Sequence, residues 1–145
     1  MRNRFRNARR SNRRGSAMVE GALTLTLVVY TLIAIVDVGQ VLTMHQGLAE
    51  RARAGARWAV VNPYDSGLIR NMVVYATPYP ESGAKAALWN LSTSMVSCSL
   101  VSQGTPDARV VVGIQAYPFR FFTPVIAGLY TAKPIVVSMP VEEPY

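Results

Sequence analysis

Arg13-Arg14-Gly15-Ser16-Ala17-Met18-Val19-Glu20 opens the stretch that decides the fold, and this stretch continues to residue 62. Residues 21–36 follow without a single charge, then Asp37, then an alanine-rich tail. The apolar run and the spacing of the tail predict one continuous helix with a basic flank, a membrane-length segment and an amphipathic extension. The rest of the chain is expected to be carried on that helix.

The positive charge of the protein is concentrated at its N-terminus. Residues 1–15 hold seven arginines and no acid, whereas residues 16–145 hold eight basic and eight acidic residues. The high isoelectric point therefore belongs to a short tail, and no nucleic-acid partner is expected for a folded domain. A basic arm of this kind can still contact nucleic acid or anionic lipid, and that alternative stays open.

The chemistry-bearing residues are few. Cys98 is the one cysteine and His45 the one histidine, so the sequence excludes an internal disulfide and an ordinary His/Cys metal site. A catalytic triad would have to use His45, which lies in the expected helix. We therefore expect no enzymatic activity, no metal and no cofactor. Cys98 is expected to be a small buried apolar residue, with an intermolecular disulfide as the alternative.

The apolar run allows more than one kind of membrane segment. A spanning helix needs about 20 apolar residues, so the span must extend beyond residues 21–36 and bring Glu20 or Asp37 to its boundary. A cleaved secretory signal would have a shorter apolar core and a small-residue cleavage site after it. An uncleaved signal-anchor fits the pattern as well. In each case the arginine cluster is expected to stay cytoplasmic.

The segment around Gly15 resembles the processing site of type IV pilin-like proteins. In that family a prepilin peptidase cuts after a glycine, and the fifth residue of the mature chain is acidic. Counted from Ser16, Glu20 is the fifth residue. The resemblance implies that the basic leader is removed and that the apolar helix is kept.

The next segment narrows the resemblance to TadE-like pseudopilins. Val36-Asp37-Val38-Gly39-Gln40 and the later Ala-Arg-Ala-Gly-Ala-Arg-Trp-Ala tail, residues 52–59, look like that family's signature, with Gln40 where arginine is usual. The resemblance implies a minor pilin of a bacterial tight-adherence pilus, held in the inner membrane. It implies three kinds of partner: the prepilin peptidase, other pilins and the inner-membrane assembly platform.

The charges at the processing site have a physical role. Cleavage after Gly15 would free an α-ammonium group on Ser16, and Glu20 lies one helical turn further on. The carboxylate can pair with that ammonium within the chain or in a neighbouring subunit, which avoids leaving two unmatched charges in apolar surroundings. We expect Glu20 to act in assembly or recognition, with a carboxylate that merely reaches the interface as the alternative.

The helix is expected to become amphipathic after Asp37 and to end at Asn62, because Pro63 disfavours helix in the residue before it. One face, predicted to pack either on the chain's own globular part or on another pilin, contains Val41, His45, Leu48, Ala52, Gly55, Ala56 and Ala59. Asp37, His45, Ala52 and Ala56 are the candidate helix-packing residues. The opposite face contains Gln46, Glu50, Arg53 and Arg57.

The predicted fold is α+β. The expected divisions are a cleaved cytoplasmic leader (1–15), the N-terminal helix (16–62) and a periplasmic globular part (63–145). Strands are predicted at residues 69–76, 95–101, 109–117 and 135–141, giving three or four antiparallel strands on the small-residue face of the helix. Residues 84–93 suit either a short helix or a loop. An aromatic segment, residues 119–130, is expected to pack in the core or to form an exposed docking patch.

Two other functions remain open from sequence. One is an unprocessed single-pass inner-membrane anchor carrying a small periplasmic binding module. The other makes the arginine tail a cytoplasmic contact for nucleic acid or lipid.

Overall fold

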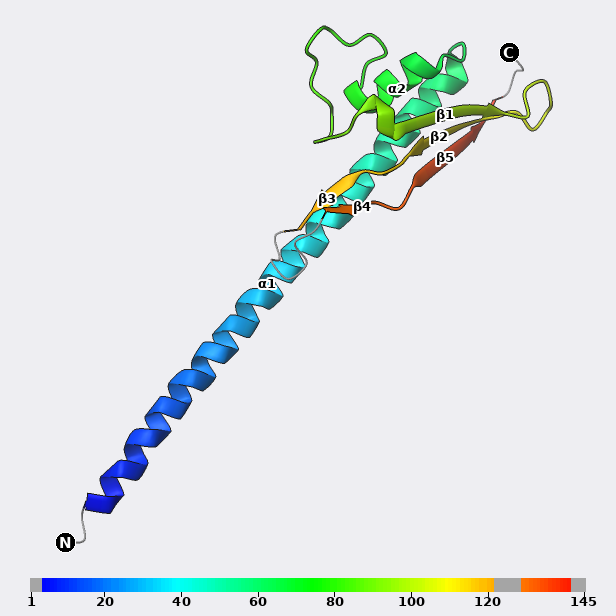
Figure 1. Cartoon of the computed structure of the whole chain (residues 1–145). Coiled ribbons are helices and arrows are strands. Elements are labelled where there is room, and N and C mark those ends of the chain that lie inside the picture. Colours follow the sequence, from blue (N-terminus) through cyan, green and yellow to red (C-terminus); the bar gives the residue numbers. More distant parts are fainter. Residues whose placement is uncertain (1–3, 122–128, 142–145) are drawn as a thin grey trace.

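A single long helix supports the whole molecule. The computed structural model describes residues 4–121 and 129–141. Helix α1, Arg4–Val61, is 58 residues long, about 87 Å at 1.5 Å per residue. A small α+β head packs along its C-terminal part, and the N-terminal part projects away from the head (Figure 1). The predicted fold class is confirmed.

The two ends of α1 test two predictions. The helix ends at Val61, as expected from Pro63, and the side-chain amide of Asn62 donates to the Trp58 carbonyl oxygen at 2.9 Å. The basic leader, whose arginine-, asparagine- and serine-rich composition predicts disorder when it is on its own, is helical over residues 4–15 as part of α1. Extending an existing helix requires no new nucleation, and arginine and alanine are good helix formers, so the leader continues the pattern.

The segment after α1 corrects another prediction. Residues 69–76 form no strand, because they belong largely to helix α2, Ser66–Tyr75. Asp65 caps this helix: its Oδ1 accepts from the Gly67 and Leu68 amides at 2.7 and 3.2 Å. The valine content suggested a strand, but Ile69, Val73 and Val74 are buried together at helical spacing. Capping and packing therefore outweigh β propensity here.

The main sheet is three-stranded and antiparallel. Its strands are β1 (Val96–Val101), β2 (Arg109–Ile114) and β5 (Ile135–Pro140), in the order β1-β2-β5. Val112 at the centre of β2 lies opposite Cys98 on β1 and Val137 on β5. β2 ends before the predicted residue 117, since Ala116 adopts a left-handed backbone with φ 56°.

A second, two-stranded sheet follows β2 directly. It consists of β3 (Pro118–Arg120) and β4 (Leu129–Thr131), with Phe119 opposite Tyr130. The predicted aromatic segment 119–130 therefore begins and ends in short strands, and residues 122–128 lie outside the described part. Residues 84–93 form turns and loop, followed by a 3₁₀ turn at Thr93–Met95.

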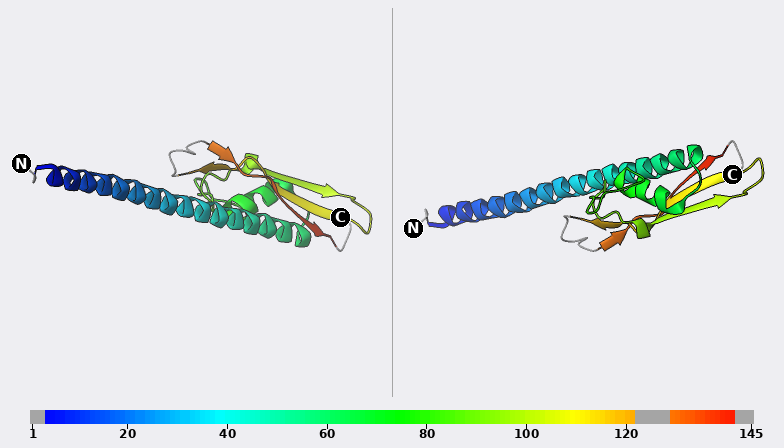
Figure 2. Two further views of the ribbon diagram at one scale, coloured as in Figure 1. Left: turned by 90° about the horizontal axis from the view of Figure 1, so that it is seen from below. Right: turned by 90° about the horizontal axis from the view of Figure 1, so that it is seen from above.

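The two helices cover one face of the main sheet. α1 contacts β2 and β5, and α2 contacts both β1 and α1; Figure 2 shows both helices on the same side of the strands. The core lies between these layers. Its fully buried members include Leu48, Ala52, Ala56, Ala59, Ile69, Val73, Val74, Val110 and Val112. The predicted polar face of α1 (Gln46, Glu50, Arg53 and Arg57) is exposed, as expected.

Helix α2 packs closely against α1 at Gly55. A Cβ placed there would lie 2.4 Å from Cγ2 of Val73 and 3.6 Å from the carbonyl oxygen of Ile69. Such a short contact forces a shift, and the short, branched valine side chain has little freedom to move away. Glycine at this position therefore lets α2 lie directly on α1.

We predict that Gly55→Ala destabilises the head. Overpacking costs about 1–3 kcal/mol, of which the higher helix propensity of alanine offsets up to about 1 kcal/mol. Chemical unfolding of the full chain in detergent, followed by near-ultraviolet circular dichroism, measures the change. Gly39→Ala is the matched control, because a Cβ there has nothing within 4 Å. An equal or higher stability of Gly55→Ala would contradict this packing.

Candidate functional site

The predicted processing residues lie on an open part of α1. Gly15 and Ser16 are exposed, and a Cβ added to Gly15 would meet no atom within 4 Å. The head is far along the same helix (Figure 1). No part of the described structure therefore covers the bond between Gly15 and Ser16.

Glu20 lies on the same side of α1 as Ser16. Positions four residues apart on a helix are neighbours, with Cβ atoms about 5–6 Å apart, and the Glu20 side chain is exposed. Its backbone carbonyl accepts the Thr24 hydroxyl at 2.9 Å. An ammonium group on Ser16 would thus be within one turn of the carboxylate.

An exposed apolar girdle surrounds the next part of α1. The helix from Gly15 to Val61 contains a segment long and apolar enough to cross a membrane. Thr24, Thr26 and Thr31 donate to the carbonyl oxygens of Glu20, Ala22 and Leu27, which satisfies the threonine hydroxyls of residues 21–36. The large side chains of the girdle are at least 45% exposed: Met18, Val19, Leu23, Leu25, Leu27, Val28, Val29, Tyr30, Leu32, Ile35, Val36, Val38 and Leu42.

Asp37 lies inside this girdle but is covered by protein. Its exposed fraction is 4%, whereas Val36 and Val38 on either side are 59% and 60% exposed. Asp37 also has an interaction partner. The sequence offered a boundary marker or a charge-neutralising residue, and it gave no sign that the folded head would cover this carboxylate.

The other candidate helix-packing residues divide into two groups. Ala52 and Ala56 are fully buried within the head, so the chain's own α2 and sheet use this face. His45 is exposed and lies outside the buried stripe, contrary to its expected place on that face. Gln40, Met44 and Leu48 occupy the head-facing side at four-residue spacing, and His45 is rotated about 100° from Met44.

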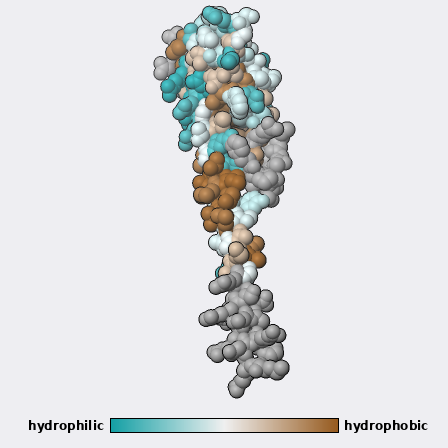
Figure 3. Space-filling view, turned by 90° about the vertical axis from the view of Figure 1, so that its left-hand side faces the viewer, coloured by the Kyte–Doolittle hydropathy of each residue, from teal (hydrophilic) through white to brown (hydrophobic). Residues whose placement is uncertain are grey.

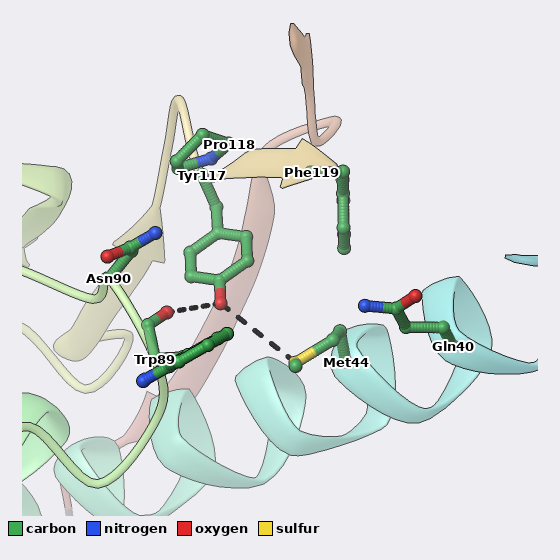
Figure 4. A pocket seen from close by; sticks show the side chains of 7 residues that line it. All are labelled: Gln40, Met44, Trp89, Asn90, Tyr117, Pro118 and Phe119. Atoms are coloured by element: carbon green, nitrogen blue, oxygen red, sulfur yellow. Dashed lines mark hydrogen bonds between the residues drawn. The ribbon is translucent and has the colours of Figure 1, made fainter. Parts of the chain in front are cut away.

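A groove lies where the head meets this part of α1. It has a volume of about 230 Å³ and is lined by Gln40, Met44, Trp89, Asn90, Tyr117, Pro118 and Phe119 (Figure 4). The buried Tyr117 hydroxyl donates to the Trp89 carbonyl oxygen and lies 3.9 Å from Met44 Sδ. The Tyr117 and Phe119 rings pack edge to face with centroids 5.4 Å apart. Sequence reasoning missed this groove, because its residues come from three separate segments.

Part of helix α1 matches a known protein family. Residues 15–57 match the family model described as TadE-like protein. The match begins at Gly15 and includes Glu20, Asp37, Ala52 and Ala56, so the resemblance seen in the sequence is confirmed over this range. No curated protein and no solved structure matches the chain.

The TadE-like segment therefore coincides with α1 alone. It covers the predicted processing residues, the apolar girdle and the buried Ala52 and Ala56, and it ends at residue 57, before Ala59 and α2. The match shows that this part of the chain is similar to TadE-like proteins. Among the residues that the structure describes, no group of three or more His, Cys, Asp and Glu side chains could hold a metal ion.

Cys98 is half-buried on β1, on the strand face that meets the helices. Burial raises the pKa of its thiol to about 11, although the nearby Arg70 guanidinium opposes the shift by charge and by hydrogen bonding. Because the thiolate is the reactive form, the folded thiol should be nearly inert at neutral pH.

We predict slow alkylation of Cys98 in the folded protein. The pKa rises by about two units from its ordinary value of 9.0, so at pH 8 the thiolate fraction and the reaction with iodoacetamide should fall about 100-fold. The rate in the native protein is compared with that in urea, followed by mass spectrometry of the single cysteine. Equal rates in the two states would show that burial does not protect this thiol.

Proposed function

We propose that this protein is a minor pilin or pseudopilin that acts in assembly of a bacterial tight-adherence pilus, in a structural and not a catalytic role. The TadE-like match over residues 15–57 carries the proposal. A prepilin peptidase removes residues 1–15, and the chain from Ser16 remains in the inner membrane through α1. The arginine-rich leader stays on the cytoplasmic side and the head lies in the periplasm.

The exposed position of Gly15 supports processing at this bond. Nothing in the described structure lies within 4 Å of a Cβ at Gly15, so a peptidase can approach the helix there. Removing the leader also improves the electrostatics of the helix start. The leader places arginines near the positive end of the helix dipole, whereas a helix that starts at Ser16 has Glu20 near that end.

The pairing of Ser16 and Glu20 supports a role in assembly. At the edge of the hydrocarbon core, the new ammonium group and the carboxylate each gain from a nearby opposite charge, which the same chain or a neighbouring pilin can supply. A neighbouring pilin helix can supply that charge only in one register, so the pair selects how helices align. Partners are therefore expected among the pilins of the same system and its inner-membrane assembly platform.

The cut site gives the first test. With a prepilin peptidase co-expressed, N-terminal sequencing and intact mass of the membrane-extracted protein should show Ser16 as the first residue. Gly15→Leu should keep the leader, because the peptidase requires a small residue before the cut in this proposal. Gly39→Leu is the matched control on the same helix and should be cut normally. An intact Met1 in the wild-type chain would instead support an unprocessed single-pass anchor.

The acid gives the second test. Glu20→Ala should still be processed and inserted, but its recovery with co-expressed pilins should fall at least tenfold, about 1.4 kcal/mol, since an ammonium loses its counter-charge. Glu50→Ala removes an exposed acid elsewhere on α1 and should assemble as wild type does. If Glu20→Ala co-isolates with pilins as well as the wild type, Glu20 has no role in assembly.

A further inference from the structure

We propose that the end of the head beside Asp37 and Met44 lies in the interfacial layer of the membrane, with Trp89 as its anchor. The partner is the lipid headgroup and glycerol region, not another protein. The inference rests on the proposed membrane span of α1, and it adds a second contact between the protein and the bilayer. The contact is formed by the groove residues Gln40, Met44, Trp89 and Asn90.

The periplasmic edge of the hydrocarbon core lies near Gln40 in the proposed span. The exposed apolar surface of α1 does not stop at Asp37, because Val38 and Leu42 are 60% and 58% exposed. Figure 3 shows hydrophobic side chains on α1 up to the place where the head begins. A span of about 20 residues that starts at Gly21, after Glu20, ends at Gln40.

Asp37 lies within that span, but it is covered by protein. An ionised carboxylate facing lipid is costly, but Asp37 is only 4% exposed and has an interaction partner. The charge is therefore shielded by the protein and not presented to acyl chains. The head must reach the membrane edge to provide this cover, which places part of the head at the depth of Asp37.

Trp89 lies at the level of the headgroup layer in this arrangement. Met44 is four residues beyond Gln40, about 6 Å along the helix axis. The headgroup layer on each side of the core is about 5–7 Å thick. The Tyr117 hydroxyl bridges Met44 Sδ and the Trp89 carbonyl oxygen, so the Trp89 backbone lies near the level of Met44 (Figure 4).

The chemistry of the exposed groups suits that layer. The Trp89 side chain is 83% exposed, which is unusual for a large apolar side chain in water but typical of interfacial belts. Its indole ring is apolar over most of its area and carries one N–H donor. Gln40 and Asn90 supply neighbouring amides that can bind glycerol and phosphate oxygens.

The two tryptophans of the chain make a direct test. Trp58 is half-buried against the core and lies 14 residues beyond Met44, about 21 Å further from the membrane. The full chain is reconstituted in phosphatidylcholine–phosphatidylglycerol vesicles with or without lipids brominated near the headgroup. Brominated lipid should reduce wild-type fluorescence substantially, and Trp89→Phe should abolish most of that reduction.

Two further measurements guard the interpretation. Trp89→Phe changes an exposed side chain, so its circular dichroism should match the wild type. Trp58→Phe, which retains only Trp89, should show the largest fractional quenching, at least about twofold. Equal, weak quenching of all three proteins, in vesicles that retain the chain after carbonate washing, would overturn the interfacial contact and leave the membrane span intact. Release of the chain by carbonate would overturn the span itself and this inference with it.

Discussion

The head depends on the close packing of α2 and the main sheet against α1. Ala52, Gly55, Ala56 and Ala59 offer α2 and the sheet almost no side-chain volume, so backbones can approach and the larger valines and isoleucines fill the space. Leu48 is the one large member of this buried stripe. The head is thus held on one side of a helix whose other side stays polar and exposed.

Helix α1 has two different environments along its length. Before Asp37 most of its large side chains are exposed, which suits lipid, and after Leu48 it has one buried and one polar face. Asp37, Gln40 and Met44 lie at the change between the two regimes. There the head covers Asp37, and the Tyr117 hydroxyl lies against Met44 Sδ.

The family match covers both the apolar part of α1 and most of the part that packs on the head. The TadE-like segment contains the girdle and most of the small-residue stripe (Ala52, Gly55 and Ala56) but no residue of α2 or the strands. In our proposal the helix sets processing and alignment, and the head sets the contacts beyond the membrane.

The elements that could be predicted from the sequence are those that a local residue pattern specifies. The run of residues 21–36 specified the apolar helix, and Pro63 specified its end. Alternation predicted strands at residues 95–101 and 109–117, and the structure has strands at residues 96–101 and 109–114. The prediction failed at residues 69–76, where valine-rich composition suggested a strand. Ile69 and Val73 bury the same helical face against Gly55, a contact 14 residues or more away in sequence that no local window contains.

The sequence by itself determined the polar face of α1 and its stripe of small residues, because each depends on spacing along one helix. Only the tertiary structure decided that Asp37 is covered, that His45 is exposed, and that Trp89 meets Met44 through Tyr117. These features join segments separated by tens of residues. Their positions follow from where the sheet docks on α1, and docking depends on the shape of the whole packed head.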